Sequence, residues 1–523
     1  MQTINYTTNM PASEVVSGPA ICVRFPYRPS RYYRHGWQSW SLTTWTDTSH
    51  ELPIPGPRLL HPMQHDPFYA LRPGHHGSWV GAVETDANKV LLLGSLQSDA
   101  HAVLEDHVLT GTYETGTGDW LIAFGDERDV FDAYARALGA RFGARAHKPS
   151  PRVWCSWYSL FTAIDEVTFS RVIDDIADLP FDVLQVDDGW QLAAGDWKPN
   201  GRFPSGMAAL AEGIKSSGRV AGLWIAPLIA ARSSQLFHEH PDWLLHDAQG
   251  KYVSAGFNWG DDLLALDTTH PQAQAWLAEL LQQVRDWGFD YVKLDFLYGG
   301  ALPGRRHQDV PREAAYRAAM QIMSDALGSD CFILACGAPI IPSLGLCDAL
   351  RIGPDASPHW ESWRDAVLLH NPCTPGTRNA IRTSLHRLWL QPLARLDPDV
   401  AYFRTIDCRL TPEQKHLLQA LALICNFRAT SDLPQSLTPT ERASLKQFLL
   451  SSPRVEQSGP RGFTIDGDRL DYESAVRLPE TTPLGFESML SALAGWAGNQ
   501  RPILRMVDKL AKRALAKRLS GIK

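Results

Sequence analysis

The stretch FDVLQVDDGW, Phe181–Trp190, decides the fold of this chain. A short, nearly continuous apolar run comes first, which is typical of a strand buried on both faces of a parallel sheet. Two aspartates, a glycine and a tryptophan follow directly. Five more units of this form occur along the chain: RVWCSW (Arg152–Trp157), RVAGLWIAP (Arg219–Pro227), FDYVKLDFLY (Phe289–Tyr298), CFILACGAP (Cys331–Pro339) and DALRIGPD (Asp348–Asp355).

Helical segments separate these units. We expect helices over Ile164–Asp178, Met207–Ser217, Gln272–Trp287 and Arg312–Leu327. Alternation of strands and helices over roughly 250 residues predicts a central (β/α)8 TIM barrel. The last two units, near Val400–Phe403 and Leu421–Phe427, have weaker patterns, and we assign the barrel to residues 147–433.

Residues 1–146 are predicted to form an N-terminal β-sandwich domain, because short apolar runs alternate with turns rich in Gly and Pro. The expected strands are Ala20–Phe25, Ser78–Glu84, Val90–Ser95, Ala102–Leu104 and Trp120–Ala123, and a helix over Val130–Phe142 is expected to join this domain to the barrel.

Residues 434–523 are predicted to form a small C-terminal region. It contains an expected helix over Thr440–Leu450 and an expected hairpin within Gly462–Val476, where Asp466-Gly467 favours a tight turn. The final segment, residues 501–523, is a basic amphipathic helix. Two roles stay open for it: docking on the domain, or weak contact with an anionic membrane or an acidic partner. The chain is therefore interpreted as a multidomain α/β protein.

Composition excludes some classes of protein. Among 523 residues, 44% are hydrophobic and 20% are charged, which is typical of globular proteins. The formal net charge of −7 argues against nucleic acid as a partner, because phosphate contacts need a basic face. The eighteen Trp stand out: core packing explains more than half of them, and Trp also suits the flat face of a sugar ring.

Cysteine usage and the N-terminus indicate a cytoplasmic protein. The eight Cys form no C-x-x-C pair and no cluster with zinc spacing, so free thiols are expected. The first sixteen residues lack the basic and apolar regions of a signal peptide. No apolar run approaches the roughly 20 residues that a membrane span needs.

Polar and aromatic side chains follow the predicted strands, at the face where barrels carry their sites. A single aspartate there is explained equally well as a helix N-cap. Helix capping does not explain five strand ends with such residues. Burying these charges together is costly unless they pair or bind a polar ligand. The residues are Asp187, Asp188, Trp224, Lys293, Asp295, Cys336, Arg351 and Asp355.

This set suits glycoside hydrolysis, which needs two carboxyl groups on either side of an anomeric carbon. Lys293 lies two residues before Asp295, so both point to one face of the strand and the ammonium stabilises the ionised carboxylate. Arg351 could pair with either carboxylate or with the sugar. Asp187 and Asp188 suit sugar hydroxyls, and a divalent metal is the rival interpretation, although no His or Glu lies near to complete its ligands.

In its motifs the chain resembles glycoside hydrolase family 36, the melibiase-type α-galactosidases, and most closely the short prokaryotic subgroup. The motifs are GWQSWS (Gly36–Ser41), WCSWY (Trp154–Tyr158), VDDGW (Val186–Trp190), GLWIAP (Gly222–Pro227), YVKLDF (Tyr291–Phe296), CGAP (Cys336–Pro339) and RIGPD (Arg351–Asp355). The C-x-x-G-G-x-R-x-D pattern of the long tetrameric members is absent, so the oligomeric state stays open, with a homo-oligomer included.

The resemblance implies hydrolysis of terminal α-D-galactosides, small or oligosaccharide, with retention and without a cofactor or metal. Asp295 would be the nucleophile and Asp355 the acid/base. Asp187 and Asp188 would bind the C4 and C6 hydroxyls, and the loop with GWQSWS would reach the site. The other implied pocket residues are Lys293 and Arg351 on the remaining hydroxyls, Trp190 and Trp224 as walls, and Cys336 in the lining.

Four alternatives remain. An α-N-acetylgalactosaminidase needs room at the C2 substituent, and neither Cys336 nor Trp190 decides this. A transglycosylase differs only in the acceptor that enters. A carbohydrate-binding protein without catalysis is disfavoured by the presence of both Asp295 and Asp355. A metal-dependent barrel hydrolase would place His at strand ends, and none of the six assigned strands ends in His.

Overall fold

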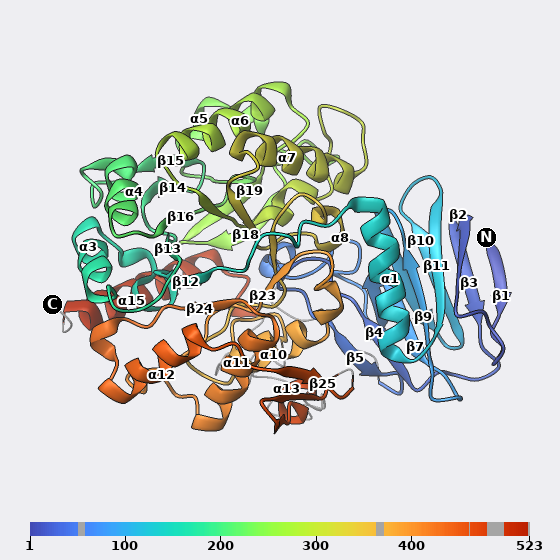
Figure 1. Cartoon of the computed structure of the whole chain (residues 1–523). Coiled ribbons are helices and arrows are strands. Elements are labelled where there is room, and N and C mark those ends of the chain that lie inside the picture. Colours follow the sequence, from blue (N-terminus) through green and yellow to red (C-terminus); the bar gives the residue numbers. More distant parts are fainter. Residues whose placement is uncertain (51–57, 362–370, 460, 479–495, 521–523) are drawn as a thin grey trace.

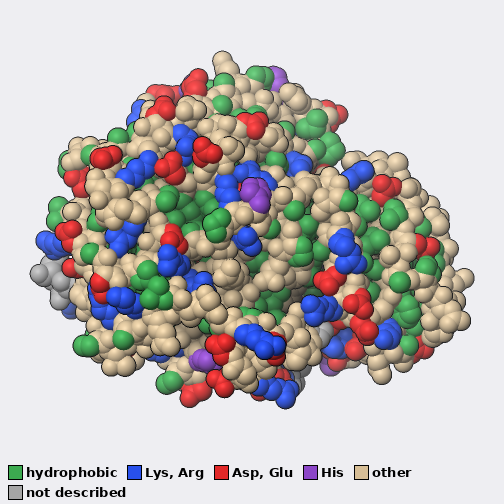
Figure 2. Space-filling view, in the orientation of Figure 1, with side chains coloured by type: hydrophobic (Ala, Val, Ile, Leu, Met, Phe, Trp, Pro, Cys, Tyr) green, Lys and Arg blue, Asp and Glu red, His purple; other side chains and the backbone are tan. Residues whose placement is uncertain are grey.

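The computed structural model describes residues 1–50, 58–361, 371–459, 461–478 and 496–520. The N-terminal strands lie at one end of the molecule, and the large parallel sheet with its helices lies at the other (Figure 1). Acidic and basic side chains are interspersed over the face shown in Figure 2. Within the described ranges, no helix combines the length and the apolar character that crossing a bilayer requires.

The N-terminal strands form two sheets. The five-stranded sheet has the order β1-β3-β10-β9-β6 and the six-stranded sheet the order β2-β11-β8-β7-β4-β5. Their bounds are β1 Gln2–Asn5, β2 Ser13–Gly18, β3 Ala20–Arg24, β4 Arg31–Arg34, β5 Thr44–Asp47, β6 His75–Ser78, β7 Val80–Glu84, β8 Val90–Ser95, β9 Ala100–Glu105, β10 Val108–Tyr113 and β11 Gly118–Gly125.

All five expected N-terminal strands are present, and Ser78–Glu84 divides into β6 and β7 at Trp79, which has a φ of 64°. Sequence analysis missed β1, β2, β4, β5 and β10. The helix α1, Glu127–Phe142, confirms the expected helix and packs on β8 and β11 of the six-stranded sheet (Figure 1).

Eight parallel strands form the barrel-like sheet, in the order β23-β22-β21-β20-β16-β13-β12-β24. The last strand pairs with the first, with Ala429 opposite Val153, while the described residues form no ladder between β23 and β24. The bounds are β12 Arg152–Cys155, β13 Val183–Val186, β16 Val220–Ile225, β20 Tyr291–Leu294, β21 Phe332–Ala335, β22 Ala349–Arg351, β23 Arg395–Asp397 and β24 Arg428–Thr430.

The four expected barrel helices are confirmed within a few residues, as α3 Glu166–Asp175, α4 Gly206–Ser216, α6 Pro271–Asp286 and α7 Arg312–Leu327. Each buries apolar residues at helical spacing, such as Leu277, Leu281 and Val284 of α6. The other helices of this part are α2 Trp157–Leu160, α5 Gln235–Glu239, α8 Ile340–Ser343, α10 Thr377–Leu385 and α11 Pro412–Ile424.

The last two barrel units were placed wrongly. The seventh strand is Arg395–Asp397, whereas Val400–Phe403 is buried but has no regular structure. Leu421–Phe427 covers the end of α11, and the eighth strand follows it at Arg428–Thr430. Both true strands have only three residues and begin with arginine, so apolar patterning could not reveal them.

The C-terminal residues confirm the expected helix as α12, Pro439–Leu450, and the expected hairpin as β26, Phe463–Ile465, with β27, Asp468–Leu470. The turn residues Asp466 and Gly467 both have positive φ. The hairpin belongs to a three-stranded sheet with β25, Val455–Gln457, and α13, Glu473–Val476, follows. The final helix is α15, Arg501–Ser520, with Ile503, Leu504 and Val507 half-buried but Leu510 54% exposed.

Two buried polar side chains, Glu313 and Arg387, join the N-terminal sheets to the barrel. Glu313 of α7 accepts hydrogen bonds from the indoles of Trp37 and Trp79, both at 2.8 Å. Arg387, after α10, donates to five carbonyl oxygens, which belong to Gly36, Gln38, Ser39, Ser41 and Ile352. Arg387 thus holds the GWQSWS loop against the barrel, and burial lowers the pKa of Arg387 to about 9.

We expect Arg387→Met to destabilise the protein strongly. All five carbonyl oxygens lose the guanidinium donor, although that of Gln38 keeps the Ser41 amide at 3.0 Å, and a buried polar group without a partner costs about 1–3 kcal/mol. The free energy of unfolding should fall by at least about 3 kcal/mol, seen as a thermal midpoint lower by several degrees. Arg454→Met is the matched control, because the Arg454 side chain is 82% exposed. Equal midpoints for the two variants would contradict this role.

Candidate active site

A cavity of about 280 Å³ brings six of the nine predicted site residues together. They lie at the carboxyl ends of β13, β16, β20 and β22, where side chains of parallel strands converge. The described lining consists of Trp40, Met63, Gln64, Trp157, Asp187, Asp188, Trp224, Asn258, Trp259, Lys293, Asp295, Phe296, Pro354, Asp355, Cys373 and Pro375.

The other three predicted residues are not among the described lining. Trp190 is fully buried, and its indole donates to the Trp224 carbonyl at 2.9 Å. Cys336 is buried after β21, and burial together with the charge of Asp295 raises the pKa of its thiol well above the usual range. Arg351 is buried and contacts Asp355. These side chains support the lining from behind.

Asp295 is surrounded by hydrogen-bond donors. Its Oδ2 accepts from the Trp224 indole at 2.9 Å and lies 3.8 Å from Lys293 Nζ, and its Oδ1 accepts from the Phe296 amide at 2.7 Å. Phe296 has a φ of 51°, so the chain turns sharply after the strand. The side chain is 7% exposed. Donors on both oxygens stabilise the ionised carboxylate.

Lys293 joins Asp295 to Asp187. Its Nζ lies 3.1 Å from Asp187 Oδ2, which also accepts from Gln185 Nε2 at 2.5 Å and from Cys155 Sγ at 3.4 Å. Burial opposes the charge on Lys293, but the carboxylates of Asp187 and Asp295 outweigh it and hold the pKa of Lys293 well above its usual value. The ammonium is therefore a permanent positive charge in the pocket.

Asp188 accepts from the Trp259 indole at 2.7 Å and from Gln191 Nε2 at 2.6 Å. Burial raises the pKa of Asp188 to about 6, although these two hydrogen bonds oppose the rise, and the charges of Asp187 and Asp295 add to it. Asp187 and Asp188 thus present two buried carboxyl groups with different partners on one wall of the cavity.

Asp355 has the opposite environment to Asp295. Its side chain is 29% exposed, and its Oδ1 lies 3.2 Å from one nitrogen of Arg351. Burial and the charge of Asp399 raise the pKa of Asp355 to about 7, although Arg351 and Lys293 oppose this rise. Near neutral pH, Asp355 can therefore give up or take back a proton, while Asp295 remains surrounded by donors.

The guanidinium of Arg351 holds three carboxylates in place. Besides Asp355 it contacts Asp397 Oδ2 at 2.8 Å and Asp399 Oδ1 at 3.0 Å. Asp399 Oδ2 accepts from the Ala356 amide at 2.8 Å and from the Tyr158 hydroxyl. Asp399 therefore contacts both the arginine and the backbone next to Asp355. Sequence analysis missed Asp397 and Asp399 because it misplaced β23, which ends at Asp397, two residues before Asp399.

We expect Asp399→Asn to shift the pH dependence of activity. A negative neighbour favours the protonated form of Asp355, so removing it should lower the pKa of Asp355. The alkaline limb of kcat/KM, where a proton donor is lost, should move down by about one pH unit. Tyr158→Phe is the control, because it removes a hydrogen bond to Asp399 but no charge. An alkaline limb that stays in place in Asp399→Asn would contradict this interpretation.

Loops supply much of the remaining lining. Trp40, from the GWQSWS loop, lines the cavity, as the resemblance implied for that loop. Trp259 lies in the two-residue turn between β18, Ser254–Asn258, and β19, Asp261–Ala265. The sequence Asn258-Trp259-Gly260 could have pointed to this residue. Asparagine and glycine favour a tight turn, and neither helix nor strand packing explains a large aromatic residue there.

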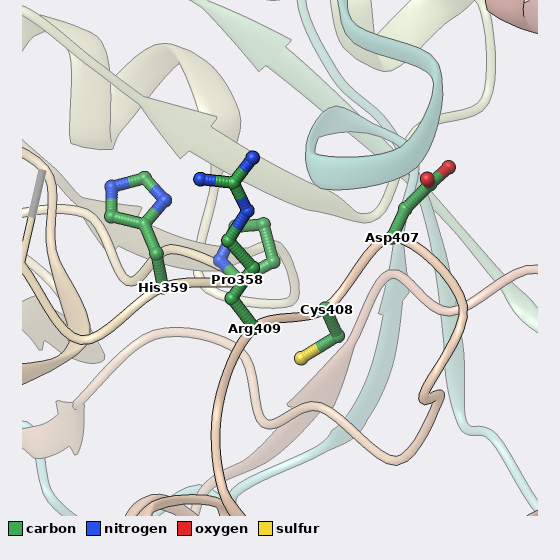
Figure 3. A pocket seen from close by; sticks show the side chains of 5 residues that line it. All are labelled: Pro358, His359, Asp407, Cys408 and Arg409. Atoms are coloured by element: carbon green, nitrogen blue, oxygen red, sulfur yellow. The ribbon is translucent and has the colours of Figure 1, made fainter. Parts of the chain in front are cut away.

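A second cavity, of about 410 Å³, has no comparable chemistry. Its described lining is Pro358, His359, Asp407, Cys408 and Arg409. The carboxyl group of Asp407 points away from His359 and Arg409, which lie next to Pro358 (Figure 3). Burial and Arg409 lower the pKa of His359. The smaller cavity, which four aspartates and a lysine line, is therefore the candidate active site.

In the described part of the chain, no group of three or more His, Cys, Asp or Glu side chains is placed so that it could hold a metal ion. Within these ranges, the partners of Asp187 are nitrogen, sulfur and backbone donors instead.

The class of protein that this fold and site define is the glycosidases. The melibiase family model matches residues 128–324. A probable α-galactosidase C of Aspergillus flavus is 32% identical over 165 residues, which are 28% of this chain and 21% of the relative. The α-galactosidase of Geobacillus stearothermophilus is 28% identical over 34% of this chain and 25% of its own length. The matches thus span about a fifth to a quarter of these curated relatives.

Solved structures extend the comparison over nearly the whole chain. An α-galactosidase from Thermus thermophilus, in complex with p-nitrophenyl α-D-galactopyranoside, is 43% identical with a TM-score of 0.85, over 89% of this chain and 95% of that chain. A GH36 α-galactosidase from Geobacillus stearothermophilus, 16% identical with a TM-score of 0.56 over 82% of this chain and 61% of its own, shares the fold. The chain belongs to the α-galactosidase family of the GH36 type.

Proposed function

We propose that this protein is a retaining α-galactosidase with Asp295 as nucleophile and Asp355 as acid/base. The observation that carries the proposal is one pocket with two carboxyl groups in opposite environments. Hydrogen-bond donors face both carboxyl oxygens of Asp295, while burial and Asp399 raise the pKa of Asp355 to about 7. Two carboxyl groups whose environments push their protonation states apart are the pattern expected of an acid and a nucleophile.

In the first step, a carboxylate oxygen of Asp295 bonds to the anomeric carbon of the galactosyl group. Asp355 gives its proton to the glycosidic oxygen as the bond from that oxygen to the anomeric carbon breaks, and the alcohol leaves. In the second step, Asp355 takes a proton from water, whose oxygen attacks the anomeric carbon and releases Asp295. Two inversions give net retention.

The remaining pocket residues suit binding of the sugar. Asp187 and Asp188 can accept hydrogen bonds from the C4 and C6 hydroxyls, Lys293 can donate to another hydroxyl, and Trp224 forms a wall. Arg351 is engaged by three aspartates, which favours holding Asp355 over binding sugar. Trp190 and Cys336 would act by supporting the wall. The substrate class follows the Thermus thermophilus relative, solved with a nitrophenyl α-galactoside and with stachyose.

The organisation of the chain belongs to the same proposal. We infer an N-terminal β-sandwich over 1–146, a (β/α)8 barrel over 147–433 and a C-terminal region over 434–523. In support, no ladder among the described strands crosses these boundaries. Among the described residues, the eight cysteines form no disulfide, which supports a reducing compartment such as the cytoplasm.

A substrate panel tests the proposal. We expect hydrolysis of 4-nitrophenyl α-galactoside, much less of the α-N-acetylgalactosaminide, the β-arabinopyranoside and the α-glucoside, and no effect of a chelator. Proton NMR of the first product should show α-galactose, because the mechanism retains configuration. Preference for the acetamido sugar, β-galactose as first product, or transfer to an added sugar in place of hydrolysis would each replace the proposal with an alternative. Binding without turnover would indicate a carbohydrate-binding protein.

A further inference from the structure

The turn that carries Trp259 has an unfavourable backbone. Trp259 and Gly260 form the two-residue connection between β18 and β19, and both have positive φ, 54° and 81°. Glycine adopts this region without penalty, whereas tryptophan does so only when its surroundings hold it there. Trp259 lines the pocket, donates to Asp188 and lies against Trp224 and Phe296, with ring centroids 6.2 and 5.4 Å away. Its position therefore shapes the sugar site.

The C-terminal helix α15 holds this turn from outside (Figure 1, red). Arg501 Nε contacts both carboxylate oxygens of Asp262, at 2.6 and 2.9 Å, and Arg505 Nε donates to the Gly260 carbonyl at 3.1 Å. The helix also comes close at Gly260, where an added Cβ would lie 3.2 Å from Asp508 Oδ2. A larger residue would press on the Asp508 side chain there, so glycine suits this close approach.

The same C-terminal segment reaches a second loop of the pocket. Asn499 Oδ1 accepts from the Leu59 amide at 2.9 Å. Leu59 belongs to a 3-10 helix, Arg58–Met63. Its last residue, Met63, and the following residue, Gln64, line the pocket. Met63 in turn packs on Gly256 of β18, where an added Cβ would lie 2.5 Å from Met63 Cγ. Both loops are thus tied to each other and to the C-terminal segment.

We propose that residues 496–520 position the pocket wall formed by Met63, Gln64, Asn258 and Trp259, and so set substrate affinity without touching the sugar. The proposal rests on the proposed function only in assigning galactosides to the pocket. Arg501 and Arg505 are positioning residues, and they contact Asp262 and Gly260, which lie three residues and one residue from Trp259. The basic helix then has a role within this chain, and attachment to an anionic membrane is not needed to explain it.

The test compares Arg501→Ala/Arg505→Ala with the control Lys509→Ala/Arg513→Ala. The control removes two basic side chains from the exposed side of the same helix, and among the described residues neither has a hydrogen bond or ion pair. We expect KM for 4-nitrophenyl α-galactoside to rise about threefold to tenfold in the first variant, with kcat within about twofold. Hydrogen exchange should also speed up for amides of residues 254–265 and 59–64.

The control variant should match the wild type in both measurements. Asp262→Asn should raise KM as Arg501→Ala does. The double variant should show little further rise, because both substitutions remove the same contact. Unchanged exchange or an unchanged KM in the Arg501→Ala/Arg505→Ala variant would overturn the proposal, as would a control variant with the same rise in KM. An inactive wild type would instead overturn the proposed function, and the exchange measurement would still test the positioning.

Discussion

Asp295→Ala is expected to lower kcat by at least about four orders of magnitude on every galactoside, because the first step loses the atom that bonds to the anomeric carbon. The variant should still fold. Lys293, which is 5% exposed, keeps its 3.1 Å contact with Asp187, so no buried charge is left unpaired. Steady-state kinetics and the thermal midpoint measure the two effects.

Azide provides the decisive control for Asp295. A small anion can enter the space left by the carboxylate and attack the anomeric carbon from the same side. The product should then be β-galactosyl azide, the inverted sugar, because only one displacement takes place. An Asp295→Ala variant that keeps more than about one per cent of wild-type kcat without azide would contradict the assignment.

Asp355→Ala is expected to slow substrates according to their leaving groups. With a galactoside of an ordinary sugar alcohol, the departing oxygen needs a proton, and we expect a loss of about two to four orders of magnitude. With 4-nitrophenol, a much better leaving group, the first step should lose far less. The ratio of kcat/KM for stachyose and the nitrophenyl galactoside measures this difference.

The pH profile separates Asp355 from a residue that only supports the fold. The alkaline limb that wild-type activity owes to a pKa of about 7 should disappear in Asp355→Ala. Azide should accelerate the second step and give α-galactosyl azide, because Asp295 still performs the first displacement. A loss of equal size on both substrates, with the alkaline limb unchanged, would show that Asp355 is not the acid/base.

Part of the site could be predicted because it lies directly after strong strands. Asp187, Asp188 and Asp295 follow runs of buried apolar residues, and parallel strands bring their carboxyl ends to one rim. Trp259, Gln64 and Cys373 come from loops between weak or irregular segments. Their place in the lining depends on how those loops return to the rim, and no local pattern encodes such a path.

Sequence position also could not separate residues that line the pocket from residues that lie behind its wall. Trp190 and Arg351 were predicted to touch the sugar, and their sequence positions at strand ends resemble those of Trp224 and Asp355. In the structure, the indole of Trp190 donates to the backbone of Trp224, and Arg351 is divided among three aspartates. Which of these residues line the pocket therefore depends on the direction of each side chain at the strand end.

The sequence by itself determined six of the eight parallel strands, the family and the two carboxyl groups proposed for catalysis. These depend on apolar runs and on the residues beside them, which are local properties. Only the tertiary structure decided that Asp399 lies against Arg351 and the Ala356 amide, and that α15 holds the turn at Trp259. Contacts between residues about 40 or 245 positions apart depend on the packing of whole elements, because burial and hydrogen bonding select partners in space and not along the chain.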